Sequence, residues 1–197
     1  MRVVGLSGKI GTGKTTLANM FLQMMGGATR RAFGDPVKEE VAEKCNIPLE
    51  WMYNQDLKLN IVPACKVEDF EFPEETVRER LQHYGTDFRR AQDPLYWIKL
   101  WTKQVQALAK DHVWILVDDL RFVEEVEAVR QFGNDAFVIR LDPYPEWVPG
   151  KYAEHISETA LDDYQDFDLR VAPGFNALPE LFVDVVKAIV TADRSTK

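Results

Sequence analysis

The sequence predicts an α/β protein in which helices cover both sides of a parallel β-sheet. Apolar runs typical of strands alternate with segments of helical apolar spacing along all 197 residues, and this alternation favours a parallel sheet. A glycine-rich turn also follows the first apolar run and leads into a helical pattern. Because such sheets bind ligands at the carboxyl ends of their strands, motifs at those ends are the first candidates for a functional site.

Length and composition set broad limits on the class of protein. The chain suits a single domain over residues 1–197, and 46% hydrophobic residues suffice for a sizeable core. A net charge of -8 disfavours a nucleic-acid polymer as partner, because phosphate contacts dominate that affinity. Cys45 and Cys65 stand alone, which indicates free thiols in a reducing compartment. No apolar run reaches membrane-spanning length, and no cleavage pattern of a secretion signal is present. We therefore expect a cytoplasmic protein that has no membrane partner.

The elements follow from apolar periodicity and from turn residues. Buried strands are predicted over residues 2–7, 112–120, 136–142 and 167–172. Helices are predicted over residues 15–25, 37–45, 74–85, 93–110, 123–133 and 178–189.

Particular residues mark several boundaries of these elements. Gly26 and Gly27 end the first helix, and the Asp35-Pro36 pair supplies a helix cap and a favoured first position for the second. Gly85 is expected to end the helix that begins at residue 74.

Two segments have no regular period. Residues 54–75 contain two prolines and end in an acidic stretch, which predicts a partly irregular insert with a solvated face. Residues 144–155 contain two prolines and a glycine, which predicts a loop or lid, and we place the lid at about 142–156.

The helix over 93–110 has the clearest amphipathic pattern. Its apolar side chains share one face and are Leu95, Ile98, Trp101, Val105 and Leu108. Trp97 and Trp101 are expected in the core, although the sequence leaves a homodimer surface open.

The glycine-rich turn, Gly8-Lys9-Ile10-Gly11-Thr12-Gly13-Lys14-Thr15, fits the phosphate-loop pattern G-x-x-x-x-G-K-[ST] between a strand and a helix. Its glycines let backbone N–H groups surround a polyphosphate, and the helix N-terminus adds partial positive charge. Lys14 can reach the β- and γ-phosphates, and the Thr15 hydroxyl can bind Mg²⁺. The sequence therefore predicts an ATP site with Mg²⁺. Its candidate residues are Gly8, Gly11, Thr12, Gly13, Lys14, Thr15 and Thr16.

Two carboxylates close the predicted strand over residues 112–120. Asp118 and Asp119 lie at the same sheet edge as the phosphate loop and can hold Mg²⁺ directly or through water. Both are candidate metal ligands, together with Thr15, and the sequence does not decide which of the two faces the metal.

The rest of the chain favours a small phosphotransferase. A GTPase needs an Asn-Lys-x-Asp segment, which is absent, and the chain is short and acidic for a motor or AAA-type ATPase. A pocket for an acceptor that carries phosphate is expected to contain arginines, because their guanidinium groups bind phosphate. The candidate arginines are Arg78, Arg80, Arg89, Arg90 and Arg121.

Five segments together resemble a known family. In chain order they are LSGKIGTGKTTLA, FGDPVKE, LQHYGTDFRR, VDDLRFVEEV and HISETALDDYQDFD. The set is similar to the bacteriophage-type deoxynucleoside monophosphate kinases, in the adenylate-kinase-like branch of phosphate-loop kinases, and the similarity spans nearly the whole chain. It departs where the family has proline and asparagine, because Val123 and Glu124 stand there.

The resemblance implies a phosphate-loop NTPase fold of the nucleoside monophosphate kinase type, with an acceptor-binding insert at about 35–92. It implies that Asp35 and Lys38 contact the acceptor nucleotide, and that Tyr84, Asp87 and Arg89 shape its pocket and hold its phosphate. Asp119 and Arg121 would organise Mg²⁺ and the transferring phosphoryl group. Lys14, Asp35, Arg89 and Arg121 are the candidate catalytic residues.

The HISE part of the last segment, with His155, Ser157 and Glu158, matches a family segment near the lid and receives no role from the resemblance.

The expected reaction moves the γ-phosphoryl of ATP to a deoxynucleoside monophosphate, in the host cytoplasm for a bacteriophage chain. An acceptor phosphate is already mostly dianionic at neutral pH, so no strong base is needed. Asp35 is therefore expected to position the acceptor nucleotide. The alternatives are a kinase of another small phosphorylated acceptor, such as dephospho-coenzyme A, and a non-enzymatic ATP-binding module. The base, the sugar preference and the oligomeric state stay open.

Overall fold

The computed structural model describes residues 1–149, 154, 156–172 and 178–194. The chain divides into two compact units, one of Met1–Ala32 with Thr102–Lys197 and the other of Phe33–Trp101. The expected acceptor-binding region, about 35–92, falls inside the second unit. The expectation of a single domain stays a prediction.

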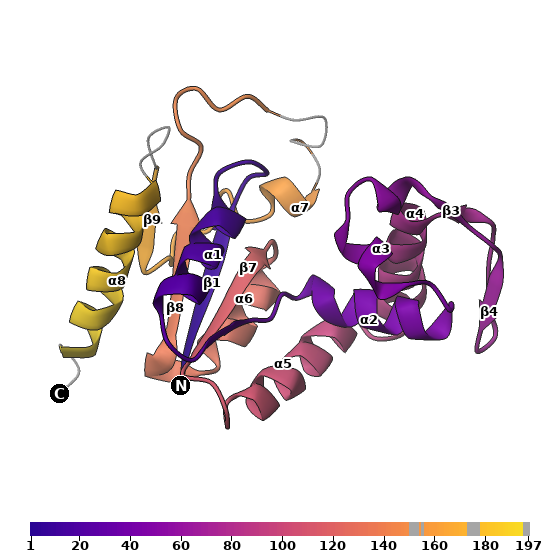
Figure 1. Cartoon of the computed structure of the whole chain (residues 1–197), viewed down its shortest axis with the longest axis horizontal. Helices are drawn as coiled ribbons and strands as arrows, with labels where there is room; N and C mark the ends of the chain where they lie inside the picture. The colour runs from indigo at the N-terminus through magenta and orange to yellow at the C-terminus, as the bar shows by residue number, and fades with distance from the viewer. Residues whose placement is uncertain (150–153, 155, 173–177, 195–197) are drawn as a thin grey trace. The chain divides into compact units, whose positions relative to one another are not determined.

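The first unit is an α/β unit around a five-stranded sheet (Figure 1). Its strands are β1 (Arg2–Gly8), β2 (Ala28–Arg30), β7 (Trp114–Leu120), β8 (Ala136–Leu141) and β9 (Leu169–Val171). Its helices are α1 (Lys14–Met24), α6 (Val123–Arg130), η3 (Gly133–Asp135), α7 (Ile156–Thr159) and α8 (Leu178–Arg194), and the border between the units falls within α5 (Tyr96–Leu108).

The strand order is β2-β7-β1-β8-β9, and every neighbouring pair is parallel. The central strand β1 pairs with β7 on one side and β8 on the other, so that Val4 lies beside Leu116 and Phe137. Strands that follow β1 therefore build the sheet outward in both directions. The carboxyl end of β1 is the place where such a sheet binds ligands.

Helices cover both faces of this sheet, as the alternation of strands and helices predicts. One face packs against α1 and α8, which lie side by side in Figure 1, and Phe21 of α1 meets Phe182 of α8 edge-on at 4.9 Å. The other face packs against α6, where a Cβ on Gly5 would clash with Leu120 and approach Val129. The expected fold class, a parallel sheet covered on both sides with a phosphate loop after the first strand, is confirmed.

The second unit is a small helical unit with two short antiparallel strand pairs. Its elements are α2 (Gly34–Lys44), α3 (Leu49–Tyr53), η1 (Leu57–Leu59), β3 (Ile61–Val62), β4 (Cys65–Val67), β5 (Phe70–Phe72), β6 (Glu75–Thr76), α4 (Val77–Gln82) and η2 (His83–Arg90). The short strands pair antiparallel, β3 with β6 and β4 with β5. The segment predicted as a partly irregular insert therefore holds a 3-10 turn and short strands. Strands of two or three residues are too short to show a period.

The prediction that a helix ends at Gly85 is wrong. α4 continues directly into η2, a wide-turn π-helix over the whole HYGTDFRR segment. Gly85 is buried, and its carbonyl accepts a hydrogen bond of 2.9 Å from the indole of Trp97. A Cβ there would lie 3.4 Å from Val37, which is an ordinary contact distance, so this glycine lies within a packed helix and does not end it.

The face predicted for α5 needs one correction. Trp97, Trp101 and Val105 are buried, which confirms the expectation that both tryptophans belong to the core. Leu95 precedes the helix and is 44% exposed. Trp97 takes the core position because its indole reaches the Gly85 carbonyl.

Candidate functional site

The glycine-rich loop lies between β1 and α1, at the carboxyl end of the central strand. A Cβ on Gly8 would lie 2.4 Å from the carbonyl oxygen of Leu141, so only glycine fits there. Gly13 caps α1 in the left-handed region with φ 92°. The buried Thr12 hydroxyl donates to the Lys9 carbonyl at 2.9 Å and closes the turn. The free N–H groups at the start of α1 favour an anion at this loop.

Lys14 is folded onto the loop that precedes it. Its side chain is buried, and its ammonium donates to the carbonyl oxygens of Gly8 and Lys9 at 2.7 Å each. Burial, followed by the charge of Arg121, lowers the pKa of Lys14 to about 8. A polyphosphate in the loop would supply the negative charge that favours the ammonium form.

The remaining candidate residues of the loop are more open. Gly11 has φ 84°, and the indole nitrogen of Trp147 lies 3.5 Å from the place of its absent Cβ. The same indole donates to the carbonyl of Ile10 at 2.8 Å. Thr15 and Thr16 lie in the first turn of α1 and are exposed.

One of the two carboxylates of β7 lies at the loop. Asp118 is buried, and its Oδ2 accepts from the Thr15 hydroxyl at 3.3 Å. Its Oδ1 accepts from Nε of Arg30 at 2.7 Å. Asp119 is half-buried at the next position of the strand. The sequence left open which of the two aspartates faces the metal. The structure places Asp118 beside Thr15.

The Thr15 and Asp118 pair fits Mg²⁺ bound to a phosphate. Mg²⁺ keeps several waters and takes one or two protein oxygens beside those of the substrate phosphates, and this pair offers one hydroxyl and one carboxylate. Within the described ranges there is no cluster of three or more His, Cys, Asp or Glu side chains that could cage a metal. The donor set therefore suits a metal that arrives with a nucleotide.

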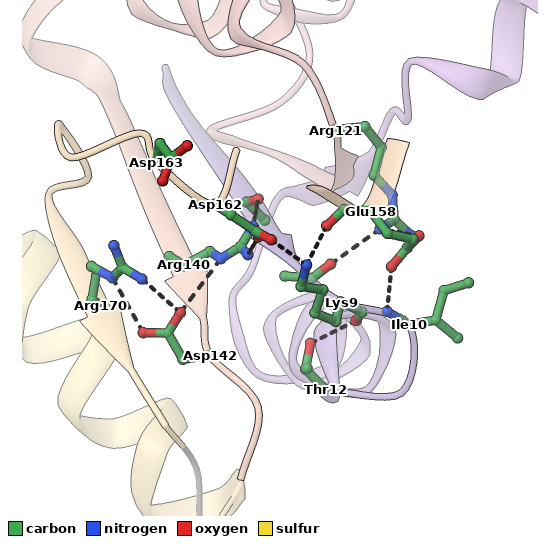
Figure 2. A network of polar contacts seen from close by, with 12 residues as sticks. Lys9, Ile10, Thr12, Arg121, Arg140, Asp142, Glu158, Asp162, Asp163 and Arg170 are labelled. Atoms are coloured by element: carbon green, nitrogen blue, oxygen red, sulfur yellow. Dashed lines mark hydrogen bonds and ion pairs between the residues drawn. The ribbon is translucent and has the colours of Figure 1, made fainter. Parts of the chain in front are cut away.

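Glu158 of α7 joins the loop to Arg121 (Figure 2). Its carboxylate is buried; Oε1 accepts from Nη1 of Arg121 at 2.5 Å, and Oε2 accepts from the N–H of Ile10 at 2.8 Å. The same Arg121 nitrogen donates to the Gly8 carbonyl at 3.2 Å. Of the HISE segment, Ser157 is half-buried and His155 lies outside the described residues.

A second ion-pair group stands beside this one in Figure 2. Arg140 donates to the Ser7 hydroxyl at 3.0 Å and to Asp162 at 2.7 Å, and Lys9 donates to the other oxygen of Asp162 at 2.5 Å. The Arg140 guanidinium is thus anchored between its own sheet and Asp162.

In the second unit, Asp35 and Lys38 lie together near the start of α2. Asp35 is buried and accepts from Lys38 at 3.1 Å and from the Tyr53 hydroxyl at 3.2 Å. The Lys38 ammonium also lies over the Tyr53 ring, 4.4 Å from its centroid. The two predicted residues are therefore brought together, with Tyr53 as a third partner.

Arg89 lies in a dense carboxylate network of the same unit. Its guanidinium donates to Glu40 at 2.7 Å through Nε, to Glu68 at 2.8 Å through Nη1 and to the Tyr84 hydroxyl at 3.3 Å through Nη2. Glu40 also accepts from the hydroxyls of Tyr84 and Tyr96 at 2.8 and 2.9 Å. Burial, with the hydrogen bond to Glu40, raises the pKa of Tyr84 well above its usual range. Tyr84 and Arg89 are thus brought together, with their polar atoms already paired.

Asp87 lines a hollow of about 350 Å³ together with Glu68 of this network. The hollow is lined by Glu68, Asp69, Phe70, Asp87, Phe88, Ala91 and Gln92. Three of these side chains are carboxylates, so the hollow itself repels phosphate.

The other candidate arginines have different surroundings. Arg80 is fully buried and donates to Glu75 at 2.7 Å and to the carbonyls of Pro63 and Pro73, so it anchors the short antiparallel strand pairs. Arg78 is exposed and donates to Gln55 at 3.1 Å. Arg90 is half-buried.

The two cysteines are free thiols, as expected, and their sulfur atoms lie 3.0 Å apart.

Three residues of the site were missed from the sequence. Arg30 follows a glycine pair that predicts only a turn, and Glu40 lies on a helix surface rich in charge, so neither position carries a signal. Trp147 is a large aromatic residue in a stretch of prolines, which is the one hint the sequence offers.

Comparisons with known proteins add little to this geometry. No family model matches the chain, and no curated protein matches it. Among solved structures, the chain is similar to shikimate kinase from Acinetobacter baumannii in complex with shikimate, at 11% identity and a TM-score of 0.48, over 97% of this chain and 94% of that one.

The sheet order and the loop at its centre define the class of protein. A parallel sheet with a glycine-rich phosphate loop between its central strand and the following helix is the phosphate-loop NTPase fold. None of the helices in the described ranges is long and apolar enough to cross a membrane.

Proposed function

We propose that the protein is an ATP-dependent kinase of (deoxy)nucleoside monophosphates, which moves the γ-phosphoryl of ATP to the acceptor phosphate. One observation carries this proposal: the Thr15 hydroxyl lies 3.3 Å from Asp118, beside a loop whose lysine is buried. That set matches what a magnesium-bound nucleotide polyphosphate needs. Arg121, which follows β7 and donates to the Gly8 carbonyl of this loop, adds a second cation for the charge of phosphoryl transfer.

The first unit would hold ATP. Lys14 would leave the carbonyls of Gly8 and Lys9 and donate to the phosphates, while the N–H groups at the start of α1 bind the β-phosphate. Thr15 and Asp118 would hold Mg²⁺, and Asp118 would then share its charge between Arg30 and the metal. Held there, Mg²⁺ would neutralise phosphate charge.

The second unit would contact the acceptor through Asp35, Lys38, Tyr84, Asp87 and Arg89. Support comes from the Asp35 and Lys38 pair, which offers both an acceptor and a cation on the first turns of one helix.

For Arg89 to hold the acceptor phosphate, it must exchange one carboxylate. Glu68 is the suitable partner to leave, because its side chain is 56% exposed whereas that of Glu40 is 11% exposed. No general base is required, since a phosphate monoester is mostly dianionic at neutral pH.

The test offers each deoxy- and ribonucleoside monophosphate separately with Mg-ATP and measures ADP release. We expect one or more deoxynucleoside monophosphates to stimulate ADP release strongly and ribonucleoside monophosphates to stimulate it weakly. Lys14→Ala should show neither stimulation.

Two other outcomes would replace the proposal. Stimulation by dephospho-coenzyme A alone would keep the kinase and change the acceptor. Tight ATP binding with no stimulation by any acceptor would favour a non-enzymatic ATP-binding module.

A further inference from the structure

Glu158 is a buried carboxylate at the phosphate loop that the proposed transfer does not use. We propose that Glu158 is a positioning residue, which aims Arg121 at the phosphoryl group held by the loop. The inference rests on the proposed function. It deepens that function by giving a role to the HISE segment, for which the sequence gives none.

The geometry of Arg121 carries the first step of the argument. Its Nη1 is held between Glu158 and the carbonyl of Gly8, and its backbone N–H donates to Glu125 at 2.8 Å. Among the described residues, no partner is found for its Nε and Nη2, and its side chain is 22% exposed. One nitrogen is thus fixed, while the others stay open to donate to a phosphoryl oxygen.

The second step is the bridge that Glu158 makes. Its two carboxylate oxygens go to different partners, one to Arg121 and the other to the N–H of Ile10 within the loop (Figure 2). The guanidinium and the loop are therefore held at a fixed distance by one rigid planar group. A shorter or neutral side chain would loosen this alignment.

The third step concerns charge. Arg121 and Lys14 are neighbouring cations, since Nη1 of Arg121 and Nζ of Lys14 both donate to the Gly8 carbonyl. Without Glu158, repulsion from Lys14 would favour conformations in which Arg121 turns toward solvent. The carboxylate therefore keeps both cations at one loop before the nucleotide arrives.

Glu158 is itself fixed by its surroundings. Its main-chain carbonyl accepts from Lys9 at 2.8 Å, and Lys9 also donates to Asp162, which Arg140 holds at 2.7 Å. These contacts tie both ends of the Glu158 residue to the loop (Figure 2). A positioning group must be this well held in order to set the direction of another side chain.

Because Glu158 acts through Arg121, its loss should slow phosphoryl transfer more than it weakens ATP binding. Removing one donor that stabilises transition-state charge commonly costs about 10²–10³ in kcat. Glu158→Gln keeps the size of the side chain and an acceptor for Ile10 but removes the charge, so we expect kcat to fall about 30-fold with KM for ATP within about threefold.

The experiment compares Glu158→Gln, Arg121→Ala and the double variant, with the exposed Glu180→Gln of α8 as matched control. Besides kcat, it measures by calorimetry how much aluminium fluoride tightens the binding of Mg-ADP, since this complex mimics the transferring phosphoryl group without an acceptor. We expect both single variants to lose most of that gain, and the double variant to resemble Arg121→Ala alone. Glu180→Gln should match wild type.

Several results would overturn the inference. One is a wild-type kcat in Glu158→Gln together with full tightening of Mg-ADP binding by aluminium fluoride. Another is a double variant in which the losses of the two single variants multiply. The third is a wild type in which aluminium fluoride does not tighten Mg-ADP binding. Glu158→Asp, which keeps the charge on a shorter arm, replaces the glutamine variant if the latter does not fold. A different result would contradict the proposed acceptor and leave this inference standing. In that case wild type phosphorylates no nucleotide acceptor, yet aluminium fluoride tightens Mg-ADP binding in a way that depends on Glu158 and Arg121.

Discussion

Lys14 carries a buried ammonium, and burial disfavours its charged form, which lowers its pKa to about 8 from an ordinary value of 10.5. Between these two values the unfolded chain binds more protons, so this group adds stability as pH rises through that window. In the proposed complex ATP would bind the charged form, and its phosphates should raise the pKa of Lys14 again. Above pH 8 we therefore expect ATP binding to take up a proton.

The measurement is calorimetry of ATP binding in buffers of different ionisation enthalpy. At pH ~9 we expect proton uptake approaching one per ATP, and at pH ~6.5 almost none from this group. Lys14→Arg, which stays charged throughout, should show no uptake at either pH. Equal uptake at pH ~9 in that variant would assign the proton to another group.

Asp118 and Asp119 give a second prediction for single residues. Asp118→Asn should lower kcat at least about 100-fold and raise the Mg²⁺ concentration needed for half-maximal rate, because Asp118 accepts from Thr15. Asp119→Asn should change the Mg²⁺ requirement much less. Magnesium titrations of the two variants decide between them, and the reverse order would move the metal to Asp119.

At the scale of residues, the sequence predicts what a motif encodes and misses what only partners decide. Lys14 and Thr15 are found because their spacing from the glycines has a chemical reason. The choice between Asp118 and Asp119 needs the path of β7 beside α1. The pairing of Glu158 with Arg121 joins residues that are 37 positions apart, and no local pattern reports such a contact.

Among the elements, the π-helix η2 is the one whose integrity is most directly testable. Trp97→Phe removes the donor to the buried carbonyl of Gly85 and should lower the free energy of unfolding by about 1–3 kcal/mol. Leu95→Ala, at the residue before α5, should cost no more than about 0.5 kcal/mol, because Leu95 is exposed. Urea denaturation measures both, and equal costs would show that this contact does not stabilise η2.

The elements found from the sequence are the long periodic ones. The helices around Leu17, Trp101 and Phe182 and the strands β1, β7 and β8 bury whole faces, and burial imposes the period that a sequence shows. β2, α3 and the short strands β3, β4, β5 and β6 were missed, because elements of two to five residues bury too few side chains, although the three-residue β9 was predicted. The π-helix was missed because its glycine, Gly85, is typical of a helix end. The hydrogen bond from Trp97 to the Gly85 carbonyl joins residues that no local pattern connects.

At the scale of the molecule, the alternation of strands and helices suffices to predict the fold class, because a parallel sheet requires a crossover after each strand. The division into two compact units was not predicted, since α5 runs across their border without a break in its apolar pattern. The net charge of -8 continues to predict no binding of nucleic-acid polymers. Cytoplasmic location and a homodimer also stay predictions.

Identification of the phosphorylated product tests the central claim most directly. Wild type and Lys14→Ala are incubated with ATP labelled in its γ-phosphoryl group, Mg²⁺ and each deoxynucleoside monophosphate, and the nucleotides are separated. The proposed function predicts the label in a deoxynucleoside diphosphate for wild type, and at least about 100-fold less in the variant. Label found only in inorganic phosphate, or an equal yield from Lys14→Ala, would contradict it.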